Sequence, residues 1–145
     1  MRVRSPSQQR RSRRRRGVAA VEMAIILPLL VTIVLGCVDL GRFAHAFIAV
    51  NNAARAGAGF ACLHPFTTTT QSKWHQQIRQ TVETELGTRF DPSKLDVPLP
   101  DVSIEPDGRK RVRVEVSYPF ETVVRWPLLP TEMNLRRAVE MRFIR

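Results

Sequence analysis

The sequence predicts an α+β protein in which a long N-terminal helix precedes a second helix and a small antiparallel sheet. Three observations support this class. Residues 18–62 are rich in apolar and small side chains and contain one proline. Residues 72–86 place apolar side chains at every fourth position, which is helical spacing. Residues 102–143 contain runs in which apolar and polar side chains alternate, as in strands with one buried face.

The net charge of +10 on this chain of 145 residues is carried mainly by the N-terminus. Of the 23 Lys and Arg residues, eight arginines precede Gly17 with no acidic residue among them, and the other 15 are balanced by 13 Asp and Glu. A nucleic-acid-binding domain spreads its basic residues over a folded face, so no nucleic-acid partner is expected. We interpret residues 1–17 as a basic leader peptide that is too polar to fold in isolation.

Residues 18–38 are predicted to form a membrane-spanning helix. These 21 residues include one charged side chain, Glu22, and a helix of that length measures about 32 Å, close to the roughly 30 Å apolar layer of a bilayer. Pro28 removes one helical hydrogen bond, which membrane helices tolerate with a kink. Because the arginines precede the span, the positive-inside rule predicts a single-pass protein with a cytoplasmic N-terminus and an extracytoplasmic C-terminal part.

Glu22 requires an explanation, because a carboxylate costs roughly 2–3 kcal/mol near the bilayer centre and less toward the interface. Two explanations fit the sequence. The side chain either reaches the head groups or the neighbouring arginines, or it pairs with a positive charge that a partner supplies. A newly formed α-amino group at Val18 would be such a charge.

The same helix is predicted to continue as an amphipathic segment over residues 39–62, because apolar side chains recur there at steps of three and four residues. Cys37 and Cys62 would then lie roughly 37 Å apart, too far for a disulfide. One face would pack closely on either the protein's own C-terminal domain or other subunits. Its small residues are Ala53, Ala54, Gly57, Ala58 and Ala61.

Residues 63–145 are predicted to form an extracytoplasmic α+β domain that begins with a second helix. Ser72 is the expected N-cap, and Gly87 is expected to end the helix. Between them, apolar residues at i, i+4 spacing would face the core. These residues are Trp74, Ile78, Val82 and Leu86.

A small sheet is expected after a proline-containing loop. Residues 102–104 and 112–120 both alternate apolar and polar side chains, and residues 106–108 between them read Pro-Asp-Gly, which predicts a β-hairpin. Pro127 and Pro130 would bracket the next turn. A third strand is expected over residues 135–143.

No enzyme, metal site or cofactor is expected from the remaining chemistry. The sequence has no nucleophile elbow, phosphate-binding glycine loop or dinucleotide motif. Its three histidines lack Cys or acidic residues at ligand spacing. They are His45, His64 and His75.

The N-terminal third resembles the TadE-like pseudopilins of the bacterial tight-adherence (Tad/Flp) type IVb pilus system. The residues that carry the resemblance are Arg15-Arg16-Gly17, Val18 to Glu22, Leu27-Pro28-Leu29-Leu30, Gly36, Asp39-Leu40-Gly41-Arg42 and Asn51 to Ala58. A basic leader, a glycine and a glutamate five residues later are similar to the type IV prepilin signal. The resemblance implies cleavage between Gly17 and Val18 by prepilin peptidase, and a location in the bacterial inner membrane.

The resemblance further implies a minor pseudopilin that helps to assemble the pilus and thereby supports adhesion and biofilm formation. Its partners would be prepilin peptidase, other Tad pseudopilins, the major pilin and the Tad platform proteins. A basic cluster in the domain would be a solvated strand face, with pilus or envelope contact as the alternative. The cluster is Arg109, Lys110, Arg111 and Arg113.

Two other functions fit parts of the sequence. An uncleaved single-pass anchor would use its arginine tail to bind anionic lipid or RNA. A secreted soluble domain would be released by signal peptidase at Ala44-His45-Ala46, although the apolar run is longer than in usual signal peptides. The first residue of the mature protein distinguishes the three: Val18, Met1 or Phe47.

Overall fold

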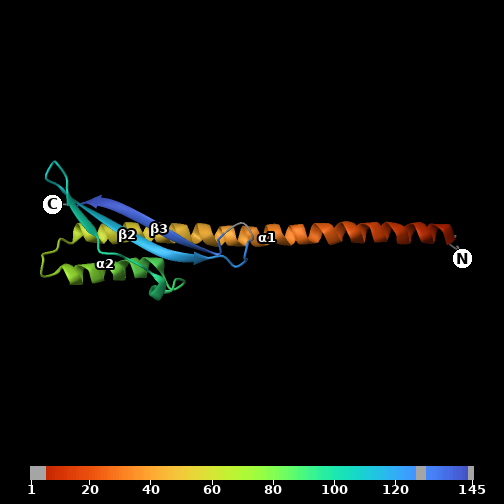
Figure 1. The fold of residues 1–145 in the computed structure, drawn as a ribbon, viewed down its shortest axis with the longest axis horizontal. Coiled ribbons are helices and arrows are strands. Elements are labelled where there is room, and N and C mark those ends of the chain that lie inside the picture. The colour runs from red at the N-terminus through yellow and green to blue at the C-terminus, as the bar shows by residue number, and fades with distance from the viewer. Residues whose placement is uncertain (1–5, 127–129, 144–145) are drawn as a thin grey trace. The chain divides into compact units, whose positions relative to one another are not determined.

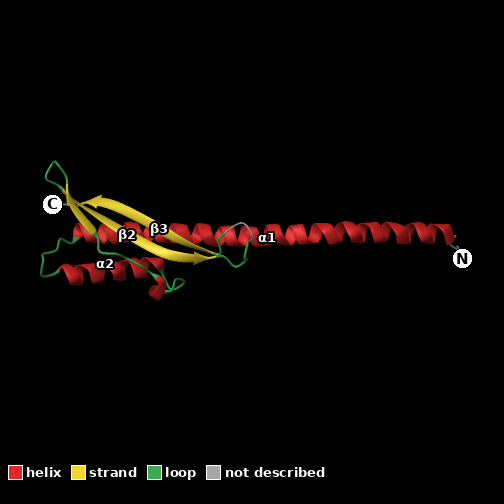
Figure 2. Cartoon of the chain, in the orientation of Figure 1, coloured by secondary structure: helices red, strands yellow, loops and turns green. Residues whose placement is uncertain are grey.

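The computed structural model of the chain describes residues 6–126 and 130–143, with side chains from Gly17 onward. The elements are α1 (Pro6–Leu63), α2 (Gln71–Leu86), a short 3-10 helix η1 (Pro92–Lys94), β1 (Asp101–Ile104), β2 (Lys110–Glu121) and β3 (Glu132–Arg142). Two helices and a three-stranded antiparallel sheet confirm the predicted α+β class (Figure 2). The chain divides into two compact units, residues 1–40 and 41–145.

The first unit is helical from Pro6, whereas the sequence predicted a leader that would not fold in isolation. The leader is continuous with a helix, and adding a residue to an existing helix costs far less than nucleating one. Arginine and glutamine are also good helix formers, and proline is favoured at a helix start. These three effects explain why the backbone of residues 6–16 is helical here.

An apolar surface covers the helix of the first unit. Among the described residues, one helical stretch, Gly17–Leu63, is long and apolar enough to cross a membrane. Its large apolar side chains are exposed from Val18 to Leu40, with Ile25 at 72%. A helix that is apolar on all sides is suited to a lipid environment. The unit is therefore compatible with a single-pass membrane protein.

The second unit has a core formed by both helices and one face of the sheet. In Figure 1, α2 lies beside the yellow part of α1, and β2 and β3 cross the same part of α1. The predicted apolar stripe of α2 is confirmed, since all four of its residues are buried. The inward residues of β2 complete the core: Val112, Val114 and Val116 are all 0% exposed.

The sheet has the order β1-β2-β3, and both pairings are antiparallel. Opposite Val112, Val114 and Val116, strand β3 places Met141, Val139 and Arg137 on the same inward face. Gly108 adopts a positive φ of 77° in the β1–β2 turn, which glycine adopts without steric cost. The predicted hairpin and third strand are confirmed, while Pro127 of the predicted second turn lies outside the described residues.

The N-terminus of α2 differs from the prediction, because Thr70 and not Ser72 is the N-cap. The Thr70 backbone N–H donates to the Thr67 carbonyl at 3.0 Å, and the Thr67 N–H donates to the Thr70 hydroxyl at 2.9 Å. This local turn starts the helix, since the Trp74 N–H donates to the Thr70 carbonyl at 2.9 Å. The expected C-terminal glycine is correct: Gly87 has a φ of 76°.

Candidate functional site

Gly17 and Val18 are adjacent at the start of the apolar part of α1, and Glu22 lies about one turn further along. Val18 is 57% exposed and Glu22 is also exposed. A Cβ added at Gly17 would meet no described heavy atom within 4 Å. Packing within the described chain therefore does not require glycine there, and a helical glycine costs about 1 kcal/mol relative to alanine.

Glu22 is surrounded by apolar side chains on the helix surface. Val21, Ile25 and Ile26 are 61%, 72% and 46% exposed. No cation from the side chains that the structure describes is paired with the Glu22 carboxylate. An unpaired carboxylate is costly in an apolar surrounding, so this position is one where an external cation would be stabilising.

Pro28 lies within α1, as expected. Proline has no N–H to donate to the carbonyl four residues earlier. The Thr32 hydroxyl donates to the carbonyl of Pro28 at 2.8 Å, one turn further along the helix. Such a bond satisfies the hydroxyl of Thr32 inside an apolar segment.

The small-residue face of α1 is used inside the chain. Ala53, Ala54, Ala58 and Ala61 are each 0% exposed. A Cβ added at Gly57 would lie 2.8 Å from Cγ2 of Val82 on α2 and 3.3 Å from Cγ1 of Val114 on β2. In the structure this face packs on the chain's own C-terminal domain, which is one of the two occupants that the sequence left open. Association through it with other subunits would require this core to open.

An aromatic and arginine cluster at one end of the second unit was not predicted. The rings of Phe43 and Phe47 are 6.1 Å apart, and Phe43 meets Phe120 edge-on at 5.5 Å. The guanidinium of Arg137 lies 4.1 Å from the centre of the Phe47 ring, and that of Arg42 lies 5.6 Å from the Phe120 ring. The sequence signal that could have revealed this cluster is Arg137, a charged residue at an inward-facing position of an alternating strand.

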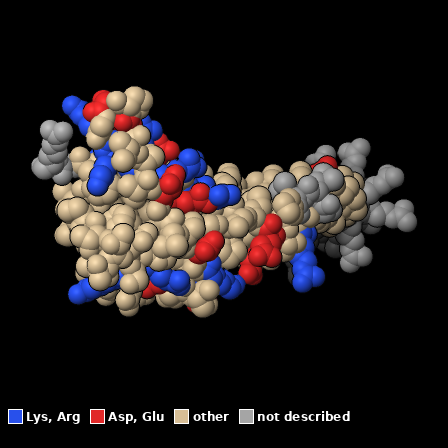
Figure 3. Space-filling model, turned by 60° about the vertical axis from the view of Figure 1, so that its left-hand side comes forward, with Lys and Arg blue, Asp and Glu red and all other residues tan. Residues whose placement is uncertain are grey.

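The outer face of the sheet carries paired charges. Arg111 contacts Glu140 at 2.8 Å and also Glu105, and Arg113 contacts Glu140 at 3.3 Å. Further along, the hydrogen bond that Arg136 donates to the Glu115 carboxylate raises the pKa of Arg136 above its ordinary value. Figure 3 shows basic and acidic side chains next to one another on the face it presents. This pairing supports the interpretation of the basic cluster as a solvated strand face.

The histidines make separate local contacts. His45 stacks on Phe90, His64 stacks on Phe60, and Nε2 of His75 lies 3.1 Å from the carbonyl of Val97. In the described part of the chain, no group of three His, Cys, Asp or Glu side chains could hold a metal ion. Cys37 and Cys62 are both free.

The long helix is also where the chain is similar to known proteins. Its residues 17–59 match the family model of TadE-like proteins. This segment is TadE-like. The match begins at the predicted cleavage residue, Gly17, and extends past Gly57 in the core. It confirms the resemblance and associates the chain with the Tad pilus system. No curated protein and no solved structure matches the chain.

The TadE-like segment thus combines two environments in one helix. Its first half carries exposed apolar side chains, and its second half supplies fully buried small residues to the folded unit. The first half therefore holds the side chains that remain available to partners, among them Val18 and Glu22. The candidate functional site is this N-terminal half of the TadE-like segment.

Proposed function

We propose that the protein is a minor pseudopilin of a Tad-type pilus, anchored in the bacterial inner membrane with its N-terminus in the cytoplasm. The observation that carries the proposal is the TadE-like match over residues 17–59, because it coincides with the apolar helix and begins at the prepilin-like signal. The protein would help to assemble the pilus, with other pseudopilins, the major pilin and platform proteins as partners. Adhesion and biofilm formation would depend on it indirectly.

Cleavage between Gly17 and Val18 by prepilin peptidase is part of this proposal. A protease binds its substrate in an extended form, so the helix must open at the cleaved bond. Glycine lowers the cost of this opening because it is a poor helix former. It also presents no side chain to the protease. The open space around Gly17 in the described chain supports a role of this kind, since internal packing does not explain the residue.

Glu22 would act after cleavage, by pairing with the new α-amino group at Val18 of a neighbouring subunit. Glu22 lies four helical residues after Val18, a rise of about 6 Å. A neighbouring helix displaced along its axis by this rise would bring the opposite charges level. Pairing would offset the cost of a carboxylate in the apolar layer.

The secreted alternative has a structural objection. Its cleavage site, Ala44–Ala46, lies inside α1, and Ala46 is buried at 5% exposure in the core of the second unit. Cleavage before Phe47 would separate Ala46 from the core to which it contributes. The uncleaved anchor differs from the pseudopilin in retaining the arginine tail.

Identification of the first residue of the protein recovered from membranes tests the proposal. Mass spectrometry of the N-terminal peptide should find Val18 when the peptidase is present, and Met1 when the peptidase gene is deleted. A protein that begins at Met1 in both strains would support the uncleaved anchor. One that begins at Phe47 would support secretion.

A further inference from the structure

The β2–β3 connection begins with side chains that are unusual for an exposed loop. Residues 122–126 read Thr-Val-Val-Arg-Trp. Val123 is 64% exposed and Arg125 is exposed, while Trp126 is half-buried. Loops at protein surfaces are commonly built from small and polar residues. An apolar surrounding would stabilise the side chains of Val123 and Trp126, and a polar boundary would accommodate Arg125 between them.

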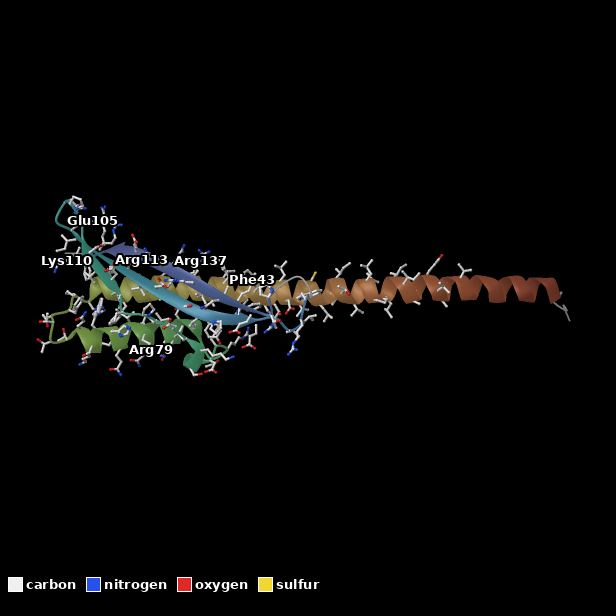
Figure 4. All side chains as sticks on the ribbon, viewed as in Figure 1. Phe43, Arg79, Glu105, Lys110, Arg113 and Arg137 are labelled. Atoms are coloured by element: carbon white, nitrogen blue, oxygen red, sulfur yellow. The ribbon has the colours of Figure 1, made fainter. Side chains whose placement is uncertain are left out.

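The base of this loop is held against the start of the second unit. Nη1 of Arg42 donates to the carbonyl of Glu121 at 3.4 Å, and the Arg42 guanidinium lies over the Phe120 ring. The Thr122 N–H donates to the Thr131 carbonyl at 3.0 Å and closes the loop. In Figure 4, Phe43 lies at this end of the sheet, and Glu105 and Lys110 lie at the other.

The chain connectivity places this end of the unit near the bilayer surface. Arg42 follows Val38, the last residue of the predicted span, by four positions. Because α1 is helical here, these four residues rise about 6 Å along its axis. The interfacial layer on each side of the apolar layer is about 5–8 Å thick. Arg42 and the end of β2 that it holds are thus within reach of the head groups.

We propose that residues 123–126 dock into the interfacial layer of the membrane that the chain's own helix spans. Tryptophan is enriched at this depth because its ring is apolar and its N–H is polar. Val123 would enter the outer acyl region, and Arg125 and Arg42 would meet phosphate groups. The ligand is anionic phospholipid. The folded unit would then contact the membrane at a second place besides its helix, which restricts its tilt.

The charges near the loop are consistent with a lipid surface. Two exposed carboxylates lie at the base of the loop, Glu121 on β2 and Glu132 opposite it on β3, and the Glu121 carboxylate is paired with the ammonium of Lys94 at 2.9 Å. This pairing reduces repulsion from anionic head groups. This inference rests on the membrane anchoring contained in the proposed function.

The two tryptophans of the chain provide the test. Trp74 is 4% exposed in the core, so it serves as an internal reference. The full chain is reconstituted in vesicles of equal parts phosphatidylcholine and phosphatidylglycerol, with or without bromine on the acyl chains. Brominated lipid should quench part of the wild-type fluorescence, and Trp126→Phe should remove that part. Trp126→Phe with Asp107→Trp moves the ring to the β1–β2 turn, where aqueous iodide and not brominated lipid should quench it.

Each other outcome overturns the inference. Equal quenching by brominated lipid in wild type and Trp126→Phe would place Trp126 outside the bilayer. Protection of Trp126 from both lipid and iodide would indicate cover by protein, hence a subunit contact. Flotation of the vesicles after an alkaline wash separates the two proposals: a chain that does not float refutes the anchoring, and a chain that floats without lipid quenching refutes the docking alone.

Discussion

Gly57 of α1 lies directly against Val82 of α2, so that a Cβ at position 57 would come within 2.8 Å of the Val82 Cγ2 atom. We expect Gly57→Leu to lower the free energy of unfolding of the second unit by about 1–3 kcal/mol or more, the usual effect of overpacking a core. Thermal unfolding of the full chain in detergent measures the change. Gly57→Ala should be milder, and Val82→Ala should relieve part of its effect in the double variant.

Gly59 provides the matched control for Gly57. It lies on the same helix, but a Cβ added there would meet no described heavy atom within 4 Å. Gly59→Ala should therefore raise stability by about 0.5–1 kcal/mol, the helix-propensity gain. An unchanged unfolding temperature in Gly57→Leu would contradict the close packing of Gly57 against α2.

Gly17→Val should block maturation, because a branched side chain obstructs a site that must accept an extended peptide. We expect the Val18 N-terminus to fall to a small fraction of its wild-type abundance, measured by mass spectrometry of membrane extracts. Gly41→Val is the control, since that glycine also lies on α1 with no described atom within 4 Å of an added Cβ. Normal processing of the Gly17 variant would contradict the prediction.

Glu22→Ala should leave much of the cleavage intact and reduce piliation, because the proposed role of the carboxylate is in assembly and not in recognition by the peptidase. Counting pili by electron microscopy, alongside the fraction of Val18 N-termini, separates the two steps. Glu22→Gln keeps the shape and removes the charge, so it should resemble Glu22→Ala if ion pairing matters. Wild-type piliation in both variants would exclude the pairing role.

The Lys94–Glu121 pair should make a small contribution to stability that disappears in acid. The hydrogen bond from Lys94 holds the pKa of Glu121 below its ordinary value of 4.5. A carboxylate whose pKa is lower in the folded state stabilises the fold above the unfolded-state pKa, and this stabilisation is lost as the pH falls through the folded-state pKa. Both side chains are about half exposed, so solvent screens the interaction.

The measurement is the unfolding temperature of the full chain in detergent from neutral pH downward. Wild type should lose slightly more stability below pH 4.5 than Glu121→Gln does, and high salt should reduce the difference. Glu85→Gln is the control, because Glu85 is an exposed carboxylate on α2 without an ion pair among the described side chains. Identical pH profiles for wild type and Glu121→Gln would refute the contribution.

Periodic patterns explain which features were predictable. The i, i+4 stripe of α2 and the alternation in β2 each follow from burial of one face, which is a local property of the sequence. The TadE-like resemblance was equally local, since its motifs lie within one helix. The α+β class and the TadE-like segment were therefore predictable before any tertiary contact was known.

Features that depend on distant partners were not predictable. A stripe of small residues permits close approach by any backbone, so the sequence left open whether Gly57 meets Val82 or another subunit. The contact between Arg137 and Phe47 likewise joins β3 to α1, and no local pattern pairs those positions. Thr70 became the N-cap because its hydroxyl bonds to Thr67, a turn that competes with the signal from Ser72.

The contact between Phe47 and Arg137 also constrains the order in which the protein is made. About 90 residues separate the two side chains along the chain. At roughly 5–20 residues per second, α1 leaves the ribosome roughly 5–18 s before the strand that covers Phe47. During that interval the buried face of α1 has no sheet to pack on. Newly made chains therefore pass through a stage that favours binding by chaperones, and truncations within β3 should prolong it.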